Sequence, residues 1–310
     1  MIDDFNLDDL LAAAIAKGRV PKKSRGMNAG NRTMLEKMKP MVERAAPITG
    51  RGVGYKMFVA KLIRSMAVSE MNKVYRLLKE AREQGIIPWG WIADETRELE
   101  RTPTWDRPDE FAKSAIRGYR LDFWKQQPSR CEVWSEKGTI RGVLQPVLDE
   151  YGVGFRVMHG YASATVVNEI AQSYDDGSKP LTALHVGDFD PSGLHMSEVD
   201  LPERLAKYGG NHVQVKRIAL IQEQLAPLPS FPARDKRKDP RYDWFVFEHG
   251  NSCWEIDAFD PNLLRACVEA SIKICILDPE TWERCEQVNQ AQINSLREVM
   301  TSWAATVNGG

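Results

Sequence analysis

Hydrophobic residues in the first third of the chain recur at the spacing of α-helices. In residues 70–84, apolar side chains fall every three or four positions and charged side chains fall between them. This spacing predicts an amphipathic helix that ends at Gly85. A second helix is expected over residues 55–66. The segment IIPWGWIAD, residues 86–94, is punctuated by Pro and Gly and predicts an extended, hairpin-like element.

From residue 131 onward, short apolar runs alternate with helical patterns. Strands are expected at residues 131–136, 153–160, 181–190 and 212–220, with helices at residues 138–152, 163–177 and 193–209. Strands that alternate with helices in this way form a mostly parallel sheet that is covered by helices. The sequence therefore predicts an α/β fold with a Rossmann-like sheet in its second part.

Length and composition narrow the class of protein. A chain of 310 residues with 43% hydrophobic and 27% charged residues is long enough for two domains with their own cores. No apolar run reaches the length of a membrane span, and the acidic start MIDDFNLDDL is unlike a signal peptide, so we expect no membrane and a cytoplasmic location. Five cysteines without a C-x-x-C pair argue against a disulfide framework and a zinc ribbon.

Charge is distributed unevenly along the chain. Residues 1–130 contain 25 Lys and Arg against 17 Asp and Glu, and residues 131–310 contain 17 against 26. The excess of basic residues in the first part indicates a polyanionic partner such as DNA, and drift of composition is the plainer alternative. The candidate contacts are Lys73, Arg76, Lys79 and Arg82 on the amphipathic helix and Lys22, Lys23 and Arg25 on a basic arm.

The order of elements agrees with this interpretation. A helix, a turn, a basic helix and a short β-wing follow one another as in a winged-helix domain, and helix-turn-helix proteins place the second helix in the major groove. An ordinary surface helix and a disordered tail remain open as alternatives.

Three carboxylates are expected at one edge of the sheet. Glu136 ends the first strand, and Asp188 and Asp190, in the stretch LHVGDFDPSGLHM, end the third. Because chemistry in parallel sheets gathers beyond the carboxyl ends of the strands, these residues are candidate ligands of Mg²⁺, with Mn²⁺ or Ca²⁺ as substitutes. The alternative is a simple turn that closes the strand. Lys137 is placed to contact a phosphate or solvent, and His185 is expected in the core.

The segments EVWSEK (132–137), GDFDPSG (187–193) and CWEIDAF (253–259) together resemble the Toprim domain. They are most similar to those of the A subunit of topoisomerase VI and the meiotic double-strand-break transesterases, and above all to the short stand-alone mini-A proteins of bacteria, phages and mobile elements. The resemblance covers roughly residues 45–275. It implies a basic arm at residues 1–44, a winged-helix domain at residues 45–128, and a Toprim domain with C-terminal helices at residues 129–310.

This family uses a tyrosine nucleophile four residues after an arginine, and RGVGYKMF supplies Arg51 and Tyr55. The family often has an aromatic residue just before the nucleophile, where this chain has Gly54. A tyrosine with a pKa near 10 needs a neighbouring cation or base to become a nucleophile. Tyr161 is the rival tyrosine, and a packing role for Tyr55 is the alternative.

The resemblance further implies a type IIB topoisomerase-like reaction on double-stranded DNA. Tyr55 forms a 5′-phosphotyrosyl link, with Arg51, Glu136 and Lys137 assisting, and two protomers form a dimer that cuts both strands. The chain contains no P-loop, so strand passage would need a separate ATPase subunit. A cytoplasmic protein of this type is expected on the nucleoid, or in the host cytoplasm if a phage encodes it. A metal-dependent hydrolytic nuclease and a non-catalytic DNA-binding protein are the other hypotheses.

Two further segments contain charged residues that could serve the site. The run FPARDKRKDPRYDW is a basic loop in the acidic half, suited to a DNA flank or to solvent. Its cations are Arg234, Lys236, Arg237, Lys238 and Arg241. Glu255 and Asp257 alternate with apolar residues, which indicates a half-buried strand and a structural or second-metal role.

Overall fold

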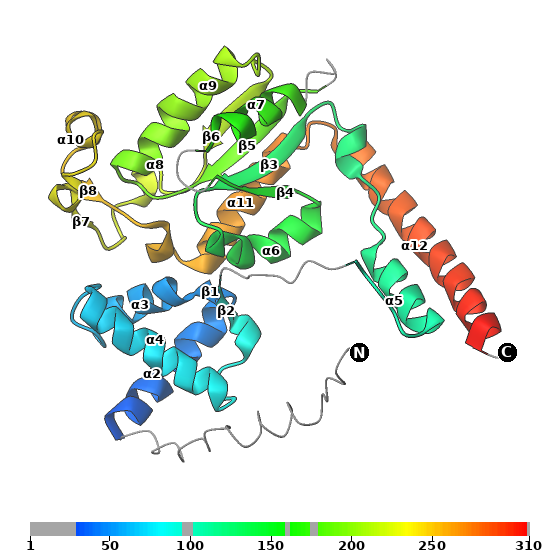
Figure 1. The fold of residues 1–310 in the computed structure, drawn as a ribbon, viewed down its shortest axis with the longest axis horizontal. Coiled ribbons are helices and arrows are strands. Elements are labelled where there is room, and N and C mark those ends of the chain that lie inside the picture. The colour runs from blue at the N-terminus through cyan, green and yellow to red at the C-terminus, as the bar shows by residue number, and fades with distance from the viewer. Residues whose placement is uncertain (1–28, 95–101, 159–161, 174–178, 309–310) are drawn as a thin grey trace, which may run out of the picture.

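The computed structural model describes residues 29–94, 102–158, 162–173 and 179–308 (Figure 1). A group of N-terminal helices lies beside a larger part that is built on a four-stranded parallel sheet. The α/β class expected from the sequence is therefore confirmed. None of the helices in the described segments combines the length and the apolar character that crossing a membrane requires.

The N-terminal group consists of α2 (Ala29–Ala45), α3 (Gly50–Val59) and α4 (Val68–Glu83). The amphipathic helix predicted at residues 70–84 is confirmed as α4. Its apolar face is buried against residues of α2 and α3, and comprises Met71, Val74, Leu77, Leu78 and Ala81. Residues 29–44, which the sequence suggested as part of an arm, instead form α2 and contribute Met38 and Val42 to this core.

Helix α3 lies earlier in the chain than the predicted 55–66. It begins at Gly50 because the Thr49 hydroxyl accepts the Gly52 N–H at 2.9 Å, as an N-cap does. It ends before Lys61, whose φ of 58° is left-handed. A side chain at Gly54 would meet the Met71 sulfur at 2.4 Å, so the glycine in front of Tyr55 allows α3 and α4 to approach closely.

Residues 86–94 do not form the hairpin-like element that the sequence predicts. The segment forms a short 3₁₀ turn, η1 (Trp89–Trp91), and the two-residue strand β2 (Ile92–Ala93), which pairs in parallel with β1 (Ile48–Thr49). Pro88 has no N–H group to donate to a β-ladder, and β2 pairs with β1, which precedes α3 in the chain. The β1–β2 pair thus lies on the side of the N-terminal group that faces the larger part (Figure 1).

The larger part contains β3 (Arg130–Ser135), β4 (Gly154–Val157), β5 (Leu181–Val186) and β6 (Val213–Arg217). The strand order is β4-β3-β5-β6, and all neighbours are parallel. The predicted strand and helix alternation is therefore confirmed. Ser135 pairs with Val186, so β3 and β5 end side by side.

Helices cover both faces of the sheet. One face packs on α6 (Thr139–Tyr151) and α11 (Pro261–Cys275), and the other on α7 (Ala164–Ser173) and α9 (Leu201–Lys207). The chain leaves β5 through α8 (Pro191–His195) and the π-helical turn η3 (Met196–Asp200).

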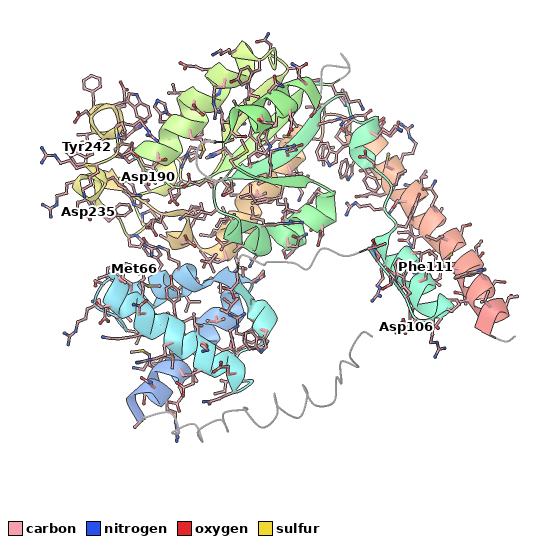
Figure 2. The ribbon with its side chains drawn as sticks, viewed as in Figure 1. Met66, Asp106, Phe111, Asp190, Asp235 and Tyr242 are labelled. Carbon is pink, nitrogen blue, oxygen red and sulfur yellow. The ribbon has the colours of Figure 1, made fainter. Side chains whose placement is uncertain are left out.

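After β6 the chain passes over the carboxyl ends of the strands. The elements there are η4 (Gln222–Gln224), β7 (Phe231–Pro232), η5 (Ala233–Lys236), α10 (Tyr242–His249), β8 (Ser252–Cys253) and η6 (Ile256–Ala258). Phe189 and Trp254 form an antiparallel bridge, so this segment is fastened beside the two aspartates. In Figure 2, Asp190 lies on the side of the larger part that carries Asp235 and Tyr242.

The last helix pairs with a segment from the middle of the chain. The long helix α12 (Pro279–Asn308) lies along α5 (Pro108–Gly118), away from the N-terminal group (Figure 1). Phe111 and Trp303 meet with ring centroids 5.9 Å apart. The turn η2 (Phe123–Gln126) then leads into β3, and its Phe123 and Trp124 pack edge-to-face with Trp282.

Candidate active site

Asp188 and Asp190 are both buried at the edge of the sheet, and each is paired with a lysine. Asp188 Oδ1 lies 2.9 Å from Lys137 Nζ and accepts the Ile256 N–H at 2.8 Å. Asp190 Oδ2 lies 2.9 Å from Lys236 Nζ, on the basic loop. Burying an ionised carboxylate is costly unless a cation or hydrogen bonds compensate it, and here the protein supplies both. Lys236 therefore faces inward to the site and not only outward to a DNA flank.

Asp190 also explains why Pro, Ser and Gly follow the aspartates. Its Oδ1 accepts the Gly193 N–H at 2.8 Å and caps α8, whose first residue is Pro191. A side chain at Gly193 would meet the Asp188 carbonyl oxygen at 2.4 Å. The turn therefore needs a glycine to close tightly behind the two carboxylates.

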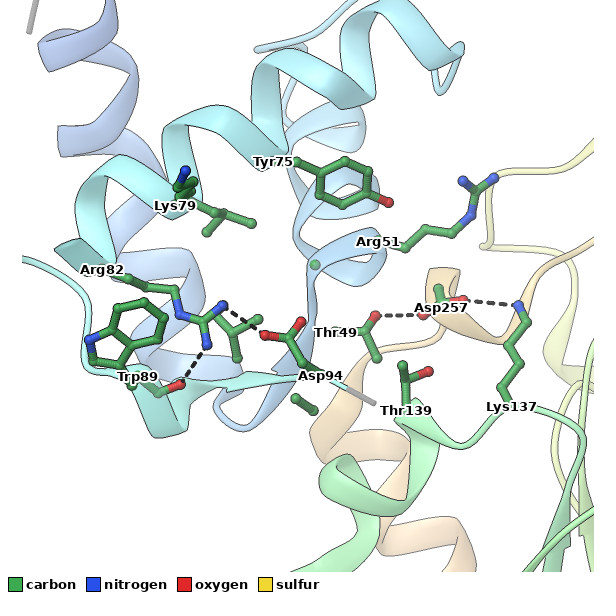
Figure 3. A pocket seen from close by; sticks show the side chains of 14 residues that line it. Thr49, Arg51, Tyr75, Lys79, Arg82, Trp89, Asp94, Lys137, Thr139 and Asp257 are labelled. Carbon is green, nitrogen blue, oxygen red and sulfur yellow. Dashed lines mark hydrogen bonds and ion pairs between the residues drawn. The ribbon is translucent and has the colours of Figure 1, made fainter. Parts of the chain in front are cut away.

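Lys137 bridges two aspartates that are distant in sequence. Its Nζ lies 3.0 Å from Asp257 Oδ2, in addition to the contact with Asp188. Asp257 in turn accepts the hydroxyl hydrogen of Thr49, the N-cap of α3 (Figure 3). Burial lowers the pKa of Lys137, but the attraction of Asp188 and Asp257 outweighs burial and raises it above the ordinary value. The ammonium group thus stays charged and holds Asp257 at the sheet edge, where Asp257 accepts the hydrogen bond from Thr49 of the N-terminal group.

A second contact between the same two parts is the ion pair of Arg51 and Glu255. Arg51 Nε and Nη2 both donate to the Glu255 carboxylate, the latter at 2.7 Å. The parallel fork of a guanidinium on a carboxylate is the strongest form of such a pair. The sequence placed Arg51 beside Tyr55 but gave no sign that Glu255 would be its partner.

Tyr55 lies next to this ion pair and is only 5% exposed. Burial raises its pKa above the ordinary value, and the negative charge of Glu255 raises it further, while Arg51 lowers it. The Arg51 guanidinium carbon is 5.9 Å from the centroid of the Tyr55 ring. Tyr55 also lines a cavity of about 770 Å³ between α3 and the segment of residues 224–229. The phenol is therefore protonated in this arrangement, with a carboxylate beside it.

Glu136 follows β3 and is partly buried beside the two aspartates. Burial, and then the negative charges of Asp188 and Asp190, raise its pKa to about 7. Lys137 and Lys236 oppose this shift. This mutual repulsion agrees with the expectation from the sequence that the three carboxylates lie at one edge of the sheet.

The donor set has the chemistry of a site for a hard divalent cation. Three carboxylates lie close enough to raise the pKa of one of them, and oxygen ligands of this kind suit Mg²⁺. In the arrangement of the described residues, no group of three or more His, Cys, Asp or Glu side chains is set to hold a metal ion. Lys137 and Lys236 hold the aspartates instead, so a divalent cation would have to replace at least one lysine.

Arg217 is a residue of the site that the sequence did not single out. It ends β6 and donates to the carbonyl oxygens of Gly187 and Asp188, the latter from Nη2 at 2.5 Å. Its Nη1 contacts Ser197 Oγ at 3.2 Å. Burial lowers its pKa to about 10, below that of a free guanidinium. The only signal in the sequence was a single arginine at the end of an otherwise alternating strand.

The predicted DNA contacts on α4 lie on its solvent side. Lys73, Arg76 and Lys79 are exposed, and Lys73 pairs with Glu70 on the same helix. Arg82 is held differently, because it forms an ion pair of 2.8 Å with Asp94 and lies over the Trp89 ring. The predicted arm residues Lys22, Lys23 and Arg25, and the rival Tyr161, fall outside the described residues.

Comparison of the chain with protein-family models, with curated proteins and with solved structures found no match. A functional assignment therefore depends on the geometry of the site and on the sequence motifs.

Proposed function

We propose that this protein binds double-stranded DNA and cleaves it by transesterification, with Tyr55 as the nucleophile, in the manner of the topoisomerase VI A subunits that its motifs resemble. One observation carries the proposal. The helix that bears Tyr55 is joined to the carboxylate edge of the sheet at two points, Arg51 to Glu255 and Thr49 to Asp257, although 204 residues or more separate each pair. A tyrosine that only packed its ring would not require an arginine–carboxylate fork beside its hydroxyl.

Each residue would have its own role in the reaction. The Tyr55 oxygen attacks a backbone phosphorus, the new bond forms a 5′-phosphotyrosyl link, and the bond from phosphorus to the 3′ oxygen breaks. The phenol proton passes to the neighbouring Glu255 carboxylate, and the departing 3′ oxygen takes a proton from solvent to become a hydroxyl. Arg51, which is paired with Glu255, turns to the phosphate once that carboxylate is protonated. The link conserves the energy of the phosphodiester bond, so the break can be resealed.

Glu136, Asp188 and Asp190 would hold Mg²⁺, or Mn²⁺ or Ca²⁺ in its place. A divalent cation there supplies positive charge against the negative charge that develops on the phosphate. Lys236 would leave Asp190 and turn to the DNA backbone, and Lys137 would keep Asp257 and Thr49 in place.

The same proposal includes the assignment of the sheet to a Toprim-type domain and of the N-terminal helices to a DNA-binding group. A four-stranded parallel sheet with Glu136 after β3 and the two aspartates after β5 supports a Toprim-type domain. The helices α2, α3 and α4 support a helix-turn-helix type of DNA-binding group without a hairpin wing, in which α4 faces DNA through Lys73, Arg76 and Lys79. A C2 homodimer, a cytoplasmic location and a separate ATPase partner remain proposals that follow from the resemblance.

One observation favours a second function, a metal-dependent hydrolytic nuclease. Tyr55 is 5% exposed and its pKa is raised, which are the properties of a tyrosine that packs and does not react. In that case water attacks the phosphate at the carboxylate edge and no protein stays on the DNA.

A cleavage-trapping assay distinguishes the two functions. Supercoiled plasmid is incubated with the protein and Mg²⁺ or Mn²⁺, quenched with detergent, and analysed with and without protease. Transesterification predicts cut DNA that enters the gel only after protease, that is lost in Tyr55→Phe and that is kept in the matched control Tyr208→Phe on the far side of the sheet. Free ends that persist in Tyr55→Phe would instead identify the nuclease.

A further inference from the structure

A cavity of about 450 Å³ lies between α4 and the sheet edge (Figure 3). Cavities of about 300–1,000 Å³ are of the size that holds small ligands. Thr49, Arg51, Lys137 and Asp257 border it from the site described above. Its other wall is formed by α4, η1 and β2, with Tyr75, Lys79, Arg82 and Trp89. The proposed function uses Lys79 of that wall as a DNA contact and gives no role to Tyr75 or Trp89.

Cationic and acidic side chains both line this cavity. Four cations, Arg51, Lys79, Arg82 and Lys137, lie beside Asp94 and Asp257, and Arg51 and Lys137 are also paired with Glu255 and Asp188 beyond the lining. Lys79 is the least engaged of the four, because its side chain is 73% exposed and its ion pair with Glu83 is long, at 3.7 Å. Lys79 is therefore the cation of this lining that is best placed to bind an anionic group.

Two aromatic rings are presented to the same space. Tyr75 is 42% exposed and Trp89 is 59% exposed. Tyr75 lies against Gly50, where an added side chain would meet ring carbon Cε1 at 3.1 Å, so the ring is set by the backbone beneath it. The Arg82 guanidinium carbon lies 4.3 Å from the Trp89 centroid and is itself fixed by Asp94. Both rings are thus held in place with area left uncovered, as a stacking surface requires.

We propose that this cavity binds one unpaired nucleotide of the DNA substrate, with its base stacked on Tyr75 or Trp89 and its phosphate at Lys79. Fixed aromatic rings next to cations are the combination that binds unpaired bases, because each base has a π-face and each nucleotide a phosphate. In a duplex the π-faces are covered by neighbouring base pairs, so only an unstacked nucleotide can use these rings. Since Arg51 and Lys137 border both regions, the nucleotide is a neighbour of the phosphate that Tyr55 attacks.

This inference rests on the proposed function in that the ligand is DNA, but it does not require Tyr55 or a metal ion. Binding is therefore measured without cleavage, by fluorescence anisotropy in EDTA. Three labelled duplexes are compared: one fully paired, one with a single internal unpaired thymine, and one with an abasic site at that position. The expected result is about ten-fold tighter binding of the duplex with the unpaired thymine than of the other two.

The variants identify the surface that is responsible. Tyr75→Ala or Trp89→Ala removes the ten-fold preference, Tyr75→Phe keeps it, and Phe247→Ala, which removes an 85% exposed ring on α10, leaves it unchanged. Equal binding of all three duplexes by the wild-type protein would overturn the inference and leave the proposed function standing. Absence of binding to any duplex would instead contradict the proposed function.

A free mononucleotide has the same base and phosphate groups as the proposed ligand. A competition experiment distinguishes binding of a free mononucleotide from binding of a nucleotide within DNA. Thymidine monophosphate is added to each complex. The inference predicts that it removes only the additional affinity for the unpaired thymine. Tight binding of the mononucleotide by a wild-type protein that shows no preference among the three duplexes would overturn the assignment to DNA.

Discussion

Arg51 and Glu255, which lie 204 positions apart in the sequence, meet as a two-bonded ion pair between helix α3 and the segment in front of η6. The pair connects the element that carries Tyr55 to the segment that crosses the ends of the strands. Tyr55 lies beside this pair, and Glu255 is among the causes of its raised pKa. This contact therefore helps to set the position of the candidate nucleophile relative to the carboxylate edge, together with the bonds from Lys56 to Asp260 and from Thr49 to Asp257.

The first prediction concerns the strength of that pair. The side chains of Arg51 and Glu255 are 36% and 17% exposed, so solvent screens the pair only in part. A double-mutant cycle of Arg51→Gln and Glu255→Gln, measured by urea denaturation, is expected to give a coupling free energy of about 1 kcal/mol. The same cycle on Lys79 and Glu83, a long and exposed pair, is expected to give about 0.3 kcal/mol or less. Equal coupling in both cycles would contradict the role given to Arg51.

The second prediction is a pH dependence that originates in Glu136. Its pKa rises from 4.5 in the unfolded chain to about 7 in the folded protein, so the folded state binds the extra proton between these values. Stability from this group is fully present below pH 4.5 and is lost as pH rises through 7. Glu136→Gln should therefore increase the free energy of unfolding at pH 8 by about 1–3 kcal/mol and leave it nearly unchanged at pH 4.5.

Urea denaturation of both proteins across this pH range is the measurement. Added Mn²⁺ should remove much of the difference at pH 8, because a cation among the three carboxylates compensates the same repulsion. A Glu136→Gln variant with the same pH profile as the wild-type protein would show that the repulsion among these groups is absent.

The third prediction concerns Arg217, which donates to the backbone carbonyls of the loop that carries the aspartates. In Arg217→Met those oxygens lose their partner, and the free energy of unfolding should fall by about 1–3 kcal/mol. The neighbouring exposed Lys216 provides the control, because Lys216→Met should change stability by about 0.5 kcal/mol or less.

Arg217 is a positioning residue in this account, so a second measurement accompanies stability. Mn²⁺ binding, followed by electron paramagnetic resonance, should weaken in Arg217→Met and recover in part in Arg217→Lys. Destabilisation without any change in Mn²⁺ binding would assign Arg217 to the fold alone.

Much of the fold could be predicted from the regular spacing of apolar residues along the sequence. The stripe from Met71 to Ala81 predicted α4, and the short apolar runs predicted the four parallel strands, because burial on one face or on two leaves a regular pattern in the sequence. The position of Glu136 and Asp188 at one edge followed from strand topology alone. The prediction of a hairpin at residues 86–94 was wrong, because β2 is two residues long and its partner β1 lies more than forty residues earlier in the chain. No local pattern in the sequence indicates that pairing.

The pairing inside the site was not predictable in the same way. Lys137 lies between Asp188 and Asp257, and Lys236 reaches Asp190, across 51, 120 and 46 positions of sequence respectively. Such contacts depend on how the 231–258 segment folds over the strands, and that segment contains only short elements without a period. For the same reason the sequence offered Glu255 and Asp257 as structural or metal-binding residues without identifying Arg51 and Thr49 as their partners.

The most direct test of the central claim is to identify the amino acid that carries the DNA. DNA trapped on the protein is trimmed with nuclease, and the protein is digested with trypsin, which cuts after Arg51 and Lys56 and so releases Tyr55 on the peptide of residues 52–56. Mass spectrometry is then expected to find this peptide with a nucleotide joined through its 5′ phosphate. A nucleotide on any other peptide, or cleaved DNA with no protein attached, would contradict the assignment of Tyr55 as the nucleophile.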